Sequence, residues 1–367
     1  MRMPLQLAYV AKEKPYSADS GVIYLDLPAK EMISAIGLDF QATVGGTVPT
    51  TTSLIDRITK IEVLLEGAKV AFSADAQLAS FLHFFQAGTV PKHHVSYRPT
   101  DYSNVRPLLH FGRFPGDPEY MLDTSKYSSA QLAIEYALNT TYEATGTTVL
   151  TVYILRPYNT VEPKGFIRSR KVHVFTGSGT AGETQVDLPT GLPWFGLGFR
   201  KFLVTSDVIT PLTDVDVDID EGRMHLYQGR IEDLLTEQAR MFGHPIVGNY
   251  IYAYPTGDTS IYCLMGDVWM AHTTLGANVA EWINNHGWYD GKLNLNIRVH
   301  DGTVSATARS ARITPMGLLP YSGWTVFDGR DAPFPAPDHS DATIKYTLGA
   351  YSPVISTWLQ EVVEGVL

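Results

Sequence analysis

Four aspartates recur at every second position in the second half of the chain, at Asp214, Asp216, Asp218 and Asp220. Successive side chains of a β-strand point to opposite faces, so this spacing places all four carboxylates on one face. They could bind a hard cation such as calcium, which takes several oxygen ligands, with Glu221 close by. The favoured alternative is a solvated strand face whose intervening apolar residues point inward, and the spacing does not match an EF-hand loop. The four aspartates are therefore a candidate metal site, and no resident metal is predicted.

Histidines form a second group that could do chemistry. His93 and His94 are adjacent, while His83 and His110 lie at some distance along the chain. Zinc binds imidazole, but adjacent side chains of a strand point to opposite faces, and no cysteine or HExxH pattern accompanies these histidines. The sequence therefore favours loop histidines near a subunit contact over a zinc site.

Motifs of catalysis and phosphate binding are incomplete in this sequence. Glycines directly flank Ser178, which breaks the spacing of a nucleophile elbow. The run Phe195–Phe199 begins like a dinucleotide-binding loop, but Lys201 stands where the third glycine is needed. The single cysteine, Cys263, lies in an apolar run and is expected to be a buried structural thiol. We therefore predict no catalytic residue and no cofactor.

Composition indicates a folded chain of two domains. Its 367 residues are 44% hydrophobic and 18% charged, and a domain usually has about 100–200 residues. A net charge of −10 disfavours contact with nucleic acid, whose phosphates repel an acidic surface. The first 20 residues lack the long apolar stretch of a signal peptide, and no window approaches about 20 continuous apolar residues. We therefore expect a protein that folds in a reducing cytosol.

Periodicity predicts mostly strands, with one helix in the first half. Period-2 runs at 33–40 and 58–65 indicate half-buried strands, and the second continues through Glu66-Gly67 into a hairpin. Apolar residues then recur at helical spacing from Leu78 to Phe85, with Ser73 as the expected N-cap. Glycine and aromatic residues are plentiful throughout, as is typical of short strands joined by turns.

The second half repeats this order of elements. Val186–Pro189 matches Leu25–Pro28 at an offset of 187 − 26 = 161, and Glu221-Gly222 matches Glu66-Gly67 at an offset of 221 − 66 = 155. A helical stretch follows again. It contains the apolar residues Ile231, Leu234, Leu235, Ala239 and Phe242. An internal duplication of this kind predicts two copies of one structural unit.

A further match supports the duplication. Leu293, Leu295 and Ile297 alternate with polar residues as Leu132, Ile134 and Tyr136 do, at an offset of 293 − 132 = 161. We therefore predict an all-β chain of two tandem eight-stranded jelly-roll sandwiches, each with a short inserted helix. Paired immunoglobulin-like sandwiches are the alternative, and the helix and the repeat length of about 160 residues argue against them.

Predicted boundaries divide the chain into four parts. Residues 1–20 form an N-terminal arm, 21–160 the first jelly roll and 161–318 the second. Residues 319–367 form a C-terminal segment in which 356–367 are expected to be a short amphipathic helix, with Trp358 and Val362 on its apolar side.

This arrangement resembles the double jelly-roll major capsid proteins of tailless icosahedral viruses with an internal membrane. The segments that carry the resemblance best are Ile58–Phe72 with the following helix, and Tyr127–Tyr136, and it covers about residues 20–315. The resemblance implies a structural protein of the virion, assembled in the host cytoplasm, that forms homotrimers with a pseudo-hexameric outline. Its partners would be itself, neighbouring capsomers, and minor capsid or membrane proteins at the termini, with no direct contact to nucleic acid.

Two other function classes remain open on the sequence. A carbohydrate-binding or adhesion protein could use exposed aromatic side chains and the face from Asp214 to Asp220. A glycan-processing enzyme on a double jelly-roll scaffold would need acids that converge in a cleft, which the sequence does not display.

Overall fold

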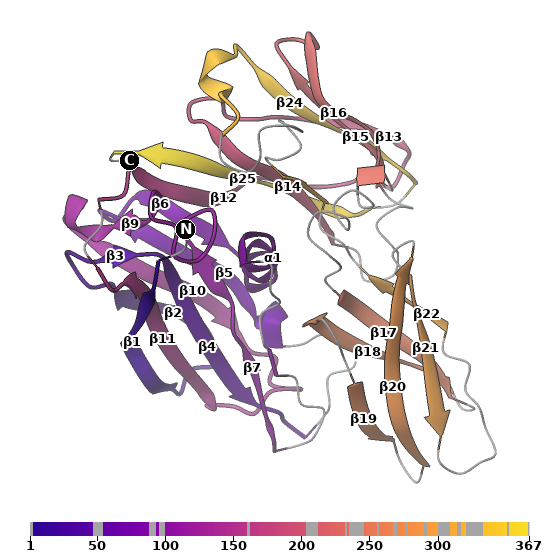
Figure 1. The fold of residues 1–367 in the computed structure, drawn as a ribbon. Coiled ribbons are helices and arrows are strands. Elements are labelled where there is room, and N and C mark those ends of the chain that lie inside the picture. The colour runs from indigo at the N-terminus through magenta and orange to yellow at the C-terminus, as the bar shows by residue number, and fades with distance from the viewer. Residues whose placement is uncertain are drawn as a thin grey trace.

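A computed structural model gives the fold of the chain (Figure 1). It describes residues 3–46, 54–87, 93–94, 100–159, 162–202, 212–231, 233–234, 333–350, 352–365 and 367, together with the backbone of seven strands between residues 246 and 320. Almost all of the described elements are strands, as predicted, and within them no helix is long and apolar enough to cross a membrane.

Two layers of sheet form the first sandwich. One layer has the strand order β1-β11-β4-β7, with β8 also paired to β4, and the other begins with the order β2-β10-β5-β6. The strands are β1 (Leu5–Tyr16), β2 (Ser20–Asp26), β4 (Ala35–Thr43), β5 (Ile58–Leu65), β6 (Lys69–Ala74), β7 (Tyr102–Val105), β8 (Leu108–His110), β10 (Ala130–Ala137) and β11 (Thr148–Pro157). A two-stranded ribbon of β3 (Met32–Ile33) and β9 (Leu122–Asp123) lies beside them, with 3-10 turns at Leu54–Arg57 and Thr124–Lys126.

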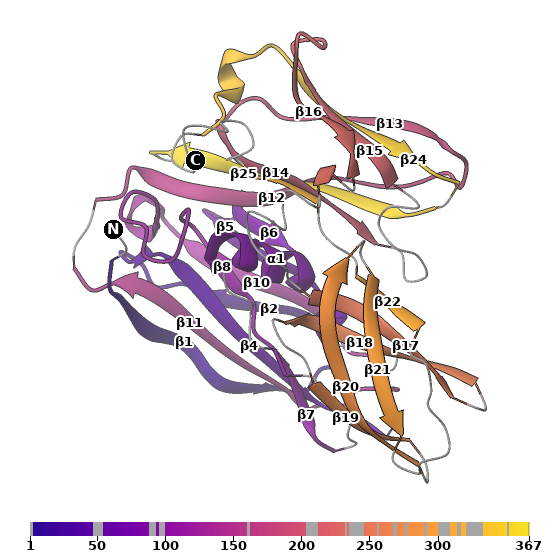
Figure 2. The same ribbon diagram turned by 45° about the vertical axis from the view of Figure 1, so that its right-hand side comes forward.

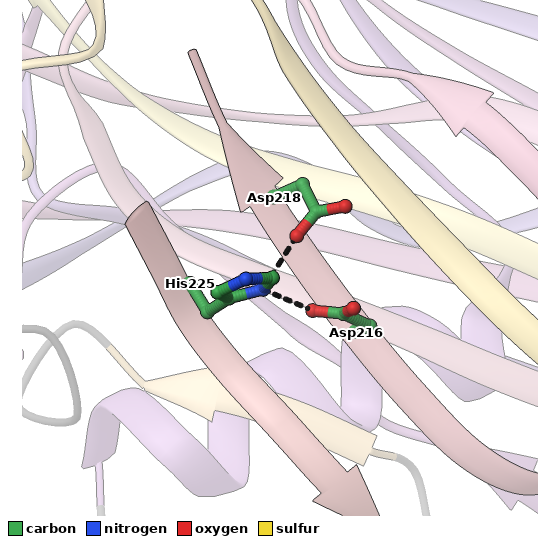
Figure 3. A group of neighbouring side chains, drawn as sticks. All are labelled: Asp216, Asp218 and His225. Carbon is green, nitrogen blue, oxygen red and sulfur yellow. Dashed lines mark hydrogen bonds and ion pairs between the residues drawn. The ribbon is translucent and has the colours of Figure 1, made fainter. Parts of the chain in front are cut away.

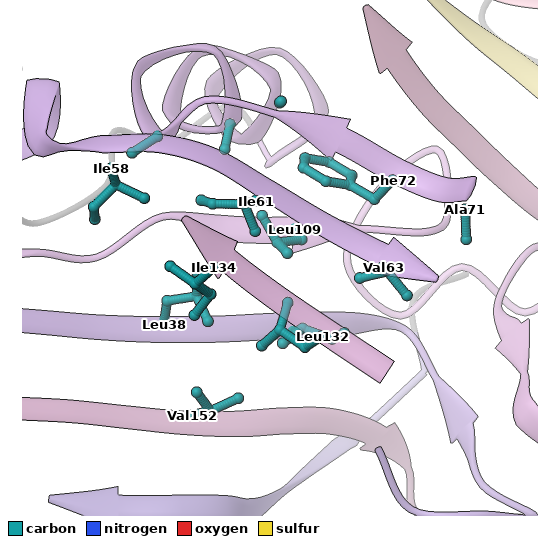
Figure 4. Close-up of a cluster of buried hydrophobic side chains, with 14 of the residues drawn as sticks. Leu38, Ile58, Ile61, Val63, Ala71, Phe72, Leu109, Leu132, Ile134 and Val152 are labelled. Atoms are coloured by element: carbon teal, nitrogen blue, oxygen red, sulfur yellow. The ribbon is translucent and has the colours of Figure 1, made fainter. Parts of the chain in front are cut away.

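The core of the first sandwich follows directly from alternation along these strands. Ile61 and Val63 of β5 and Leu132 of β10 point inward from one layer, and Leu38 of β4 and Val152 of β11 point inward from the other (Figure 4). All five are at most 1% exposed, so each contributes about 1.5–3 kcal/mol of hydrophobic stabilisation. Period-2 patterning therefore places both layers correctly around one core.

One helix, α1 (Ala76–Ala87), follows the β5–β6 hairpin and packs on β8 and β5. Asp75, not Ser73, is its N-cap, because the Asp75 carboxylate accepts a hydrogen bond of 2.9 Å from the Leu78 backbone N–H. Ser73 is still in β6, where its hydroxyl donates to the Glu62 carboxylate across the hairpin. The helix was predicted in the right place, but its cap was assigned two residues early.

The second sandwich has the same construction. One layer has the order β12-β25-β14-β23 and the other the order β13-β24-β15-β16. The strands are β12 (Gly165–Thr176), β13 (Gly182–Asp187), β14 (Trp194–Phe202), β15 (Leu212–Ile219), β16 (Met224–Arg230), β23 (Gly317–Pro320), β24 (Ala342–Leu348) and β25 (Val354–Glu364), with a 3-10 turn at Ala336–Asp338. Residues 231, 233 and 234 are helical, and the rest of the second predicted helix lies outside the described residues.

The two sandwiches share one sheet. Strand β12 of the second sandwich pairs in parallel with β6 of the first, with Ser169 opposite Phe72 and Arg170 opposite Ser73, which makes a continuous eight-stranded sheet (Figure 2). Beside this joint, the buried Glu361 carboxylate accepts hydrogen bonds from two arginines of β12, Arg168 and Arg170.

Equivalent positions in the two sandwiches confirm the predicted duplication. Gly37 lies opposite Tyr153, and a Cβ built on it would lie 2.1 Å from the tyrosine ring; Gly198 has the same relation to Trp358. Strand β1 has a register shift after Tyr9, and β12 has one after Lys171, the position that faces Trp358 as Tyr9 faces Tyr153. A glycine beneath a large aromatic ring and a bulge in the neighbouring strand are thus common to both units.

One pair of the predicted repeat is wrong. The counterpart of β10 is β24, because Ala130 and Ala342 both accept a backbone hydrogen bond from the leucine that follows the paired strand, Leu27 and Leu188. The segment 293–297 lies instead in β21, inside a separate six-stranded sheet inserted between β16 and β23. The inserted sheet has the order β18 (Gly257–Gly266), β17 (Ile246–Tyr254), β22 (Arg309–Ile313), β21 (Lys292–Val299), β20 (Asn278–Tyr289), β19 (Met270–Leu275).

Both ends of the chain differ from the prediction. Residues 5–16 are not an arm with weak structure but the edge strand β1, whose lysines and interrupted register hide the period-2 pattern. Residues 354–364 are not an amphipathic helix but β25, which lies between β12 and β14. Residues 355–363 are all buried, and polar side chains among them bond inside the structure: Glu361 to Arg168 and Arg170, Gln360 to Ser169, and Thr357 to Tyr346. These buried polar residues come in pairs between apolar pairs, and that spacing imitates an amphipathic helix in sequence.

Candidate metal site

Three of the candidate aspartates, Asp214, Asp216 and Asp218, lie on β15, in the outer layer of the second sandwich, and Asp220 directly follows the strand. Val215, Val217 and Ile219 point into the core and are 0% exposed. Asp216 and Asp218 lie on the opposite face, so the predicted alternation is confirmed. Asp218 is nevertheless 4% exposed, because side chains from the neighbouring strands cover it.

His225 of β16 brings the two carboxylates together (Figure 3). Its Nδ1 lies 2.9 Å from Oδ1 of Asp216 and 2.5 Å from Oδ1 of Asp218. Each of these three side chains offers one atom that can bind a metal ion, and the three atoms lie within 4.8 Å of one another. The carboxylate of Asp216, which accepts a hydrogen bond from the imidazole, raises the pKa of His225, and the charges of Asp216 and Asp218 act in the same direction.

Outer partners hold the far oxygen of each carboxylate. Gln228 donates a hydrogen bond of 3.2 Å to Oδ2 of Asp216, and Lys345 of β24 forms an ion pair with Oδ2 of Asp218. Both Oδ1 atoms are therefore directed at His225. Within the described residues, Oδ1 of Asp218 is buried and has no hydrogen-bond donor of proper geometry.

The other two candidate aspartates do not join this group. Asp214 lies further along the same strand, opposite Arg230 of β16. Asp220 lies in the turn after β15 with φ of 52°, and its carboxylate accepts hydrogen bonds from the Ser340 backbone N–H and hydroxyl and from His339. The hydrogen bond from His339 is the main cause that lowers the pKa of Asp220 to about 2.

His225 was missed in the sequence, although the hairpin prediction contained a signal for it. A turn at Glu221-Gly222 places residues 224–230 beside β15, and the observed register sets His225 directly opposite Asp218. A register shift between Val217 and Asp218 then brings Asp216 opposite Gln228 instead of Tyr227. That shift is a local feature of the folded hairpin and has no marker in the sequence.

His83 is part of α1 and His110 is the last residue of β8, whereas His93 and His94 lie in the connection between α1 and β7, as predicted for loop histidines. Nδ1 of His83 lies 2.8 Å from Nε2 of His110, and both rings are buried. Nε2 of His93 lies 3.2 Å from the Ser80 hydroxyl. Burial lowers the pKa of His83 to about 4 and that of His110 well below 6.5. His83 and His110 therefore serve as neutral core groups, and His94 pairs separately with Asn104.

Remaining motif residues have structural positions. Ser178 bonds with Thr180 in the turn between β12 and β13. Gly198 makes room for Trp358. Cys263 lies in β18, and its side chain is outside the described part of the chain.

Comparison with known proteins shows what the strand order represents. No family model matches the sequence, and no curated protein matches it. Among solved structures, the major capsid protein of Sulfolobus turreted icosahedral virus superposes with a TM-score of 0.60 at 11% identity, over 98% of this chain and 97% of that one. The fold is a double jelly roll.

Two further structures give the same result over almost the whole double jelly roll. The major capsid protein P2 of bacteriophage PM2 superposes with a TM-score of 0.53 at 10% identity, covering 98% of each chain. A chain of the PBCV-1 virus capsid superposes with a TM-score of 0.57 at 8% identity, covering 98% of this chain and 93% of that one. The expected fold, predicted from the order of strands and the duplicated hairpin, is confirmed.

Proposed function

We propose that this chain is a major capsid protein, a structural and non-catalytic subunit that assembles as a homotrimer into an icosahedral virus shell. The observation that carries the proposal is the likeness over 98% of the chain to major capsid proteins of known structure. The protein would be located in the virion, after assembly in the host cytoplasm. Contacts of the termini with minor capsid or membrane proteins are part of the same proposal.

The contact between the two sandwiches suggests how the trimer closes. Inside the chain, β6 of the first unit pairs with β12 of the second. The duplicated strand order makes β16 the counterpart of β6, and β1 the counterpart of β12. In the described part of the chain, β16 and β1 are each the last strand of their sheet, so their outer edges have no strand partner.

Equivalent residues can be matched across these edges. Tyr227 and Gln228 occupy the positions of Phe72 and Ser73, since they lie opposite Val217 and Asp216 as Phe72 and Ser73 lie opposite Val63 and Glu62. By the register with β11 and β25, Leu7 and Ala8 occupy the positions of Ser169 and Arg170. Inside the chain, Ser169 pairs with Phe72. The equivalent pairing between two copies would place Leu7 of one copy opposite Tyr227 of the next.

Exposure of the β1 edge supports this assignment. Leu7 is 46% exposed and Tyr9 is 56% exposed, although both are large and apolar. The position equivalent to Leu7 in the second unit is Ser169, which is 1% exposed because the first unit covers it. Apolar side chains at an open sheet edge are typical of a contact surface.

Three copies would then form a closed ring of six sandwiches. The contact between β6 and β12 would occur once within each of the three chains, and the equivalent contact between β16 and β1 would occur three times between chains. Because the interface joins different edges, it is heterologous, and it closes as a ring if each contact rotates the next sandwich by about 60°.

Light scattering of the purified full chain tests the proposal. We expect a mass of about three times 40.5 kDa for the wild type. The double variant Leu7→Glu/Tyr9→Glu should be monomeric with an unchanged far-UV circular dichroism spectrum. Tyr102→Glu is the matched control, because Tyr102 is 46% exposed on β7, at the other edge of the same sheet, and it should remain trimeric.

A wild type that stays monomeric at all concentrations would contradict the trimer. A folded Leu7→Glu/Tyr9→Glu variant that still forms trimers would contradict the assignment of the β1 edge while leaving the trimer itself intact.

A further inference from the structure

We propose that Asp216, Asp218 and His225 form a binding site for one divalent transition-metal ion of the zinc type, held between β15 and β16. The ligand atoms are Oδ1 of each aspartate and Nδ1 of the histidine, and all lie within 4.8 Å of one another. This site is independent of the capsid function proposed above, since it rests on side chains of one chain.

Among the described residues, hydrogen bonding within the group leaves one acceptor, Oδ1 of Asp218, without a donor. His225 Nδ1 carries at most one hydrogen, and its contact with Asp216 has the geometry of a hydrogen bond. Asp218 Oδ1 lies 2.5 Å from the same nitrogen, yet it is buried without a donor of its own within the described residues. A buried acceptor without a partner costs about 1–3 kcal/mol, and more when it is charged. A cation between the three atoms would satisfy all of them at once.

Supporting contacts match those of a metal site. Lys345 and Gln228 bind only the Oδ2 atoms, so each aspartate presents a single oxygen to the centre. Outer partners of this kind orient metal ligands and fix which atom binds. A metal ion that binds Nδ1 displaces the imidazole proton, and the two carboxylates and one lysine then leave a net charge of −1 to balance the cation.

The donor set selects the class of metal. An imidazole nitrogen with two carboxylate oxygens suits zinc, cobalt and related ions, whereas calcium prefers six to eight oxygens. Three protein ligands from one hairpin leave the remaining coordination positions to water. The original calcium hypothesis, with four aspartates, is therefore replaced by a smaller site with one histidine.

Cobalt and zinc titrations of the untagged full chain test the inference. We expect one Co²⁺ per chain with visible absorption bands, displacement of Co²⁺ by an equal amount of Zn²⁺, and no displacement by a tenfold excess of Ca²⁺. The variants His225→Gln and Asp216→Asn should each weaken binding at least tenfold. His339→Gln is the matched control, because His339 pairs with Asp220 and is outside the group found among the described residues, and it should bind as the wild type does.

A second readout covers a variant that fails to fold. Zn²⁺ should raise the thermal unfolding temperature of the wild type and of His339→Gln, but not that of His225→Gln, whose side chain is 39% exposed and tolerates replacement. Equal Co²⁺ binding by the wild type and His225→Gln would overturn the inference, as would displacement by Ca²⁺ or the absence of Co²⁺ binding in the wild type.

Discussion

Acidification should destabilise the first sandwich through His83 and His110. His83 of α1 and His110 of β8 are both buried, and the pKa of His83 is lowered to about 4. In the unfolded chain the pKa of each histidine returns to about 6.5. Between pH 6.5 and pH 4 the unfolded state therefore binds protons that the folded state does not. Stability contributed by the neutral rings is therefore complete above pH 6.5 and falls as the pH is lowered.

The magnitude follows from the two pKa values. Between pH 7.5 and pH 5.0, a histidine with a folded pKa of about 4 loses about 2 kcal/mol of unfolding free energy. Burial also lowers the pKa of His110 well below 6.5, so His110 adds a further loss of unfolding free energy in the same direction.

Urea unfolding at the two pH values, followed by far-UV circular dichroism, measures this loss. The wild type contains other titrating groups, so the quantity of interest is the difference from His83→Gln/His110→Gln, which should lose at least about 2 kcal/mol less on acidification. His173→Gln, a substitution at an exposed position of β12, should lose as much as the wild type. An equal loss in the double variant would refute the assignment of the pH dependence to these two rings.

Three further substitutions test the packing. Trp358→Ala, which removes a fully buried ring that lies above Gly198 and packs on the core of the first sandwich, should lower the free energy of unfolding by about 4 kcal/mol in urea. Glu361→Ala should cost about 3 kcal/mol by the same measurement, because two arginines of β12 lose their shared carboxylate; a loss below 1 kcal/mol would contradict that role. Asp75→Ala removes the N-cap of α1 and should lower stability by about 1 kcal/mol, whereas Ser73→Ala should not affect the helix cap, as helical ellipticity can show.

Sequence patterns predicted the duplicated hairpin correctly because its determinants are local. Alternation in 58–65 and 215–219 and the Glu-Gly turns at residues 66 and 221 specify strand, turn and register within a few residues. The prediction of which segment in the second half corresponds to β10 was wrong, because the answer depends on which distant segment completes the sheet. An inserted sheet with strands of its own offered a closer match in spacing than the true partner β24.

Errors at the two ends have different physical causes. Strand β1 is an edge strand, so one side of its backbone is open and its lysines face solvent, which obscures alternation. Strand β25 is central, and burial on both faces removes alternation altogether. For the candidate metal site, the row of aspartates was visible in the sequence, but His225 required the register of the hairpin.

The inserted six-stranded sheet has a practical consequence. It leaves the second sandwich between β16 and β23, the connection that corresponds in the first sandwich to the link between α1 and β7. One copy of the unit thus accommodates an entire additional sheet at a point where the other copy has a link of 14 residues, 88–101, while both keep the same strand order. The link between α1 and β7 is therefore the natural place to graft a foreign domain for display, because neither of the edges that join sandwich to sandwich passes through it.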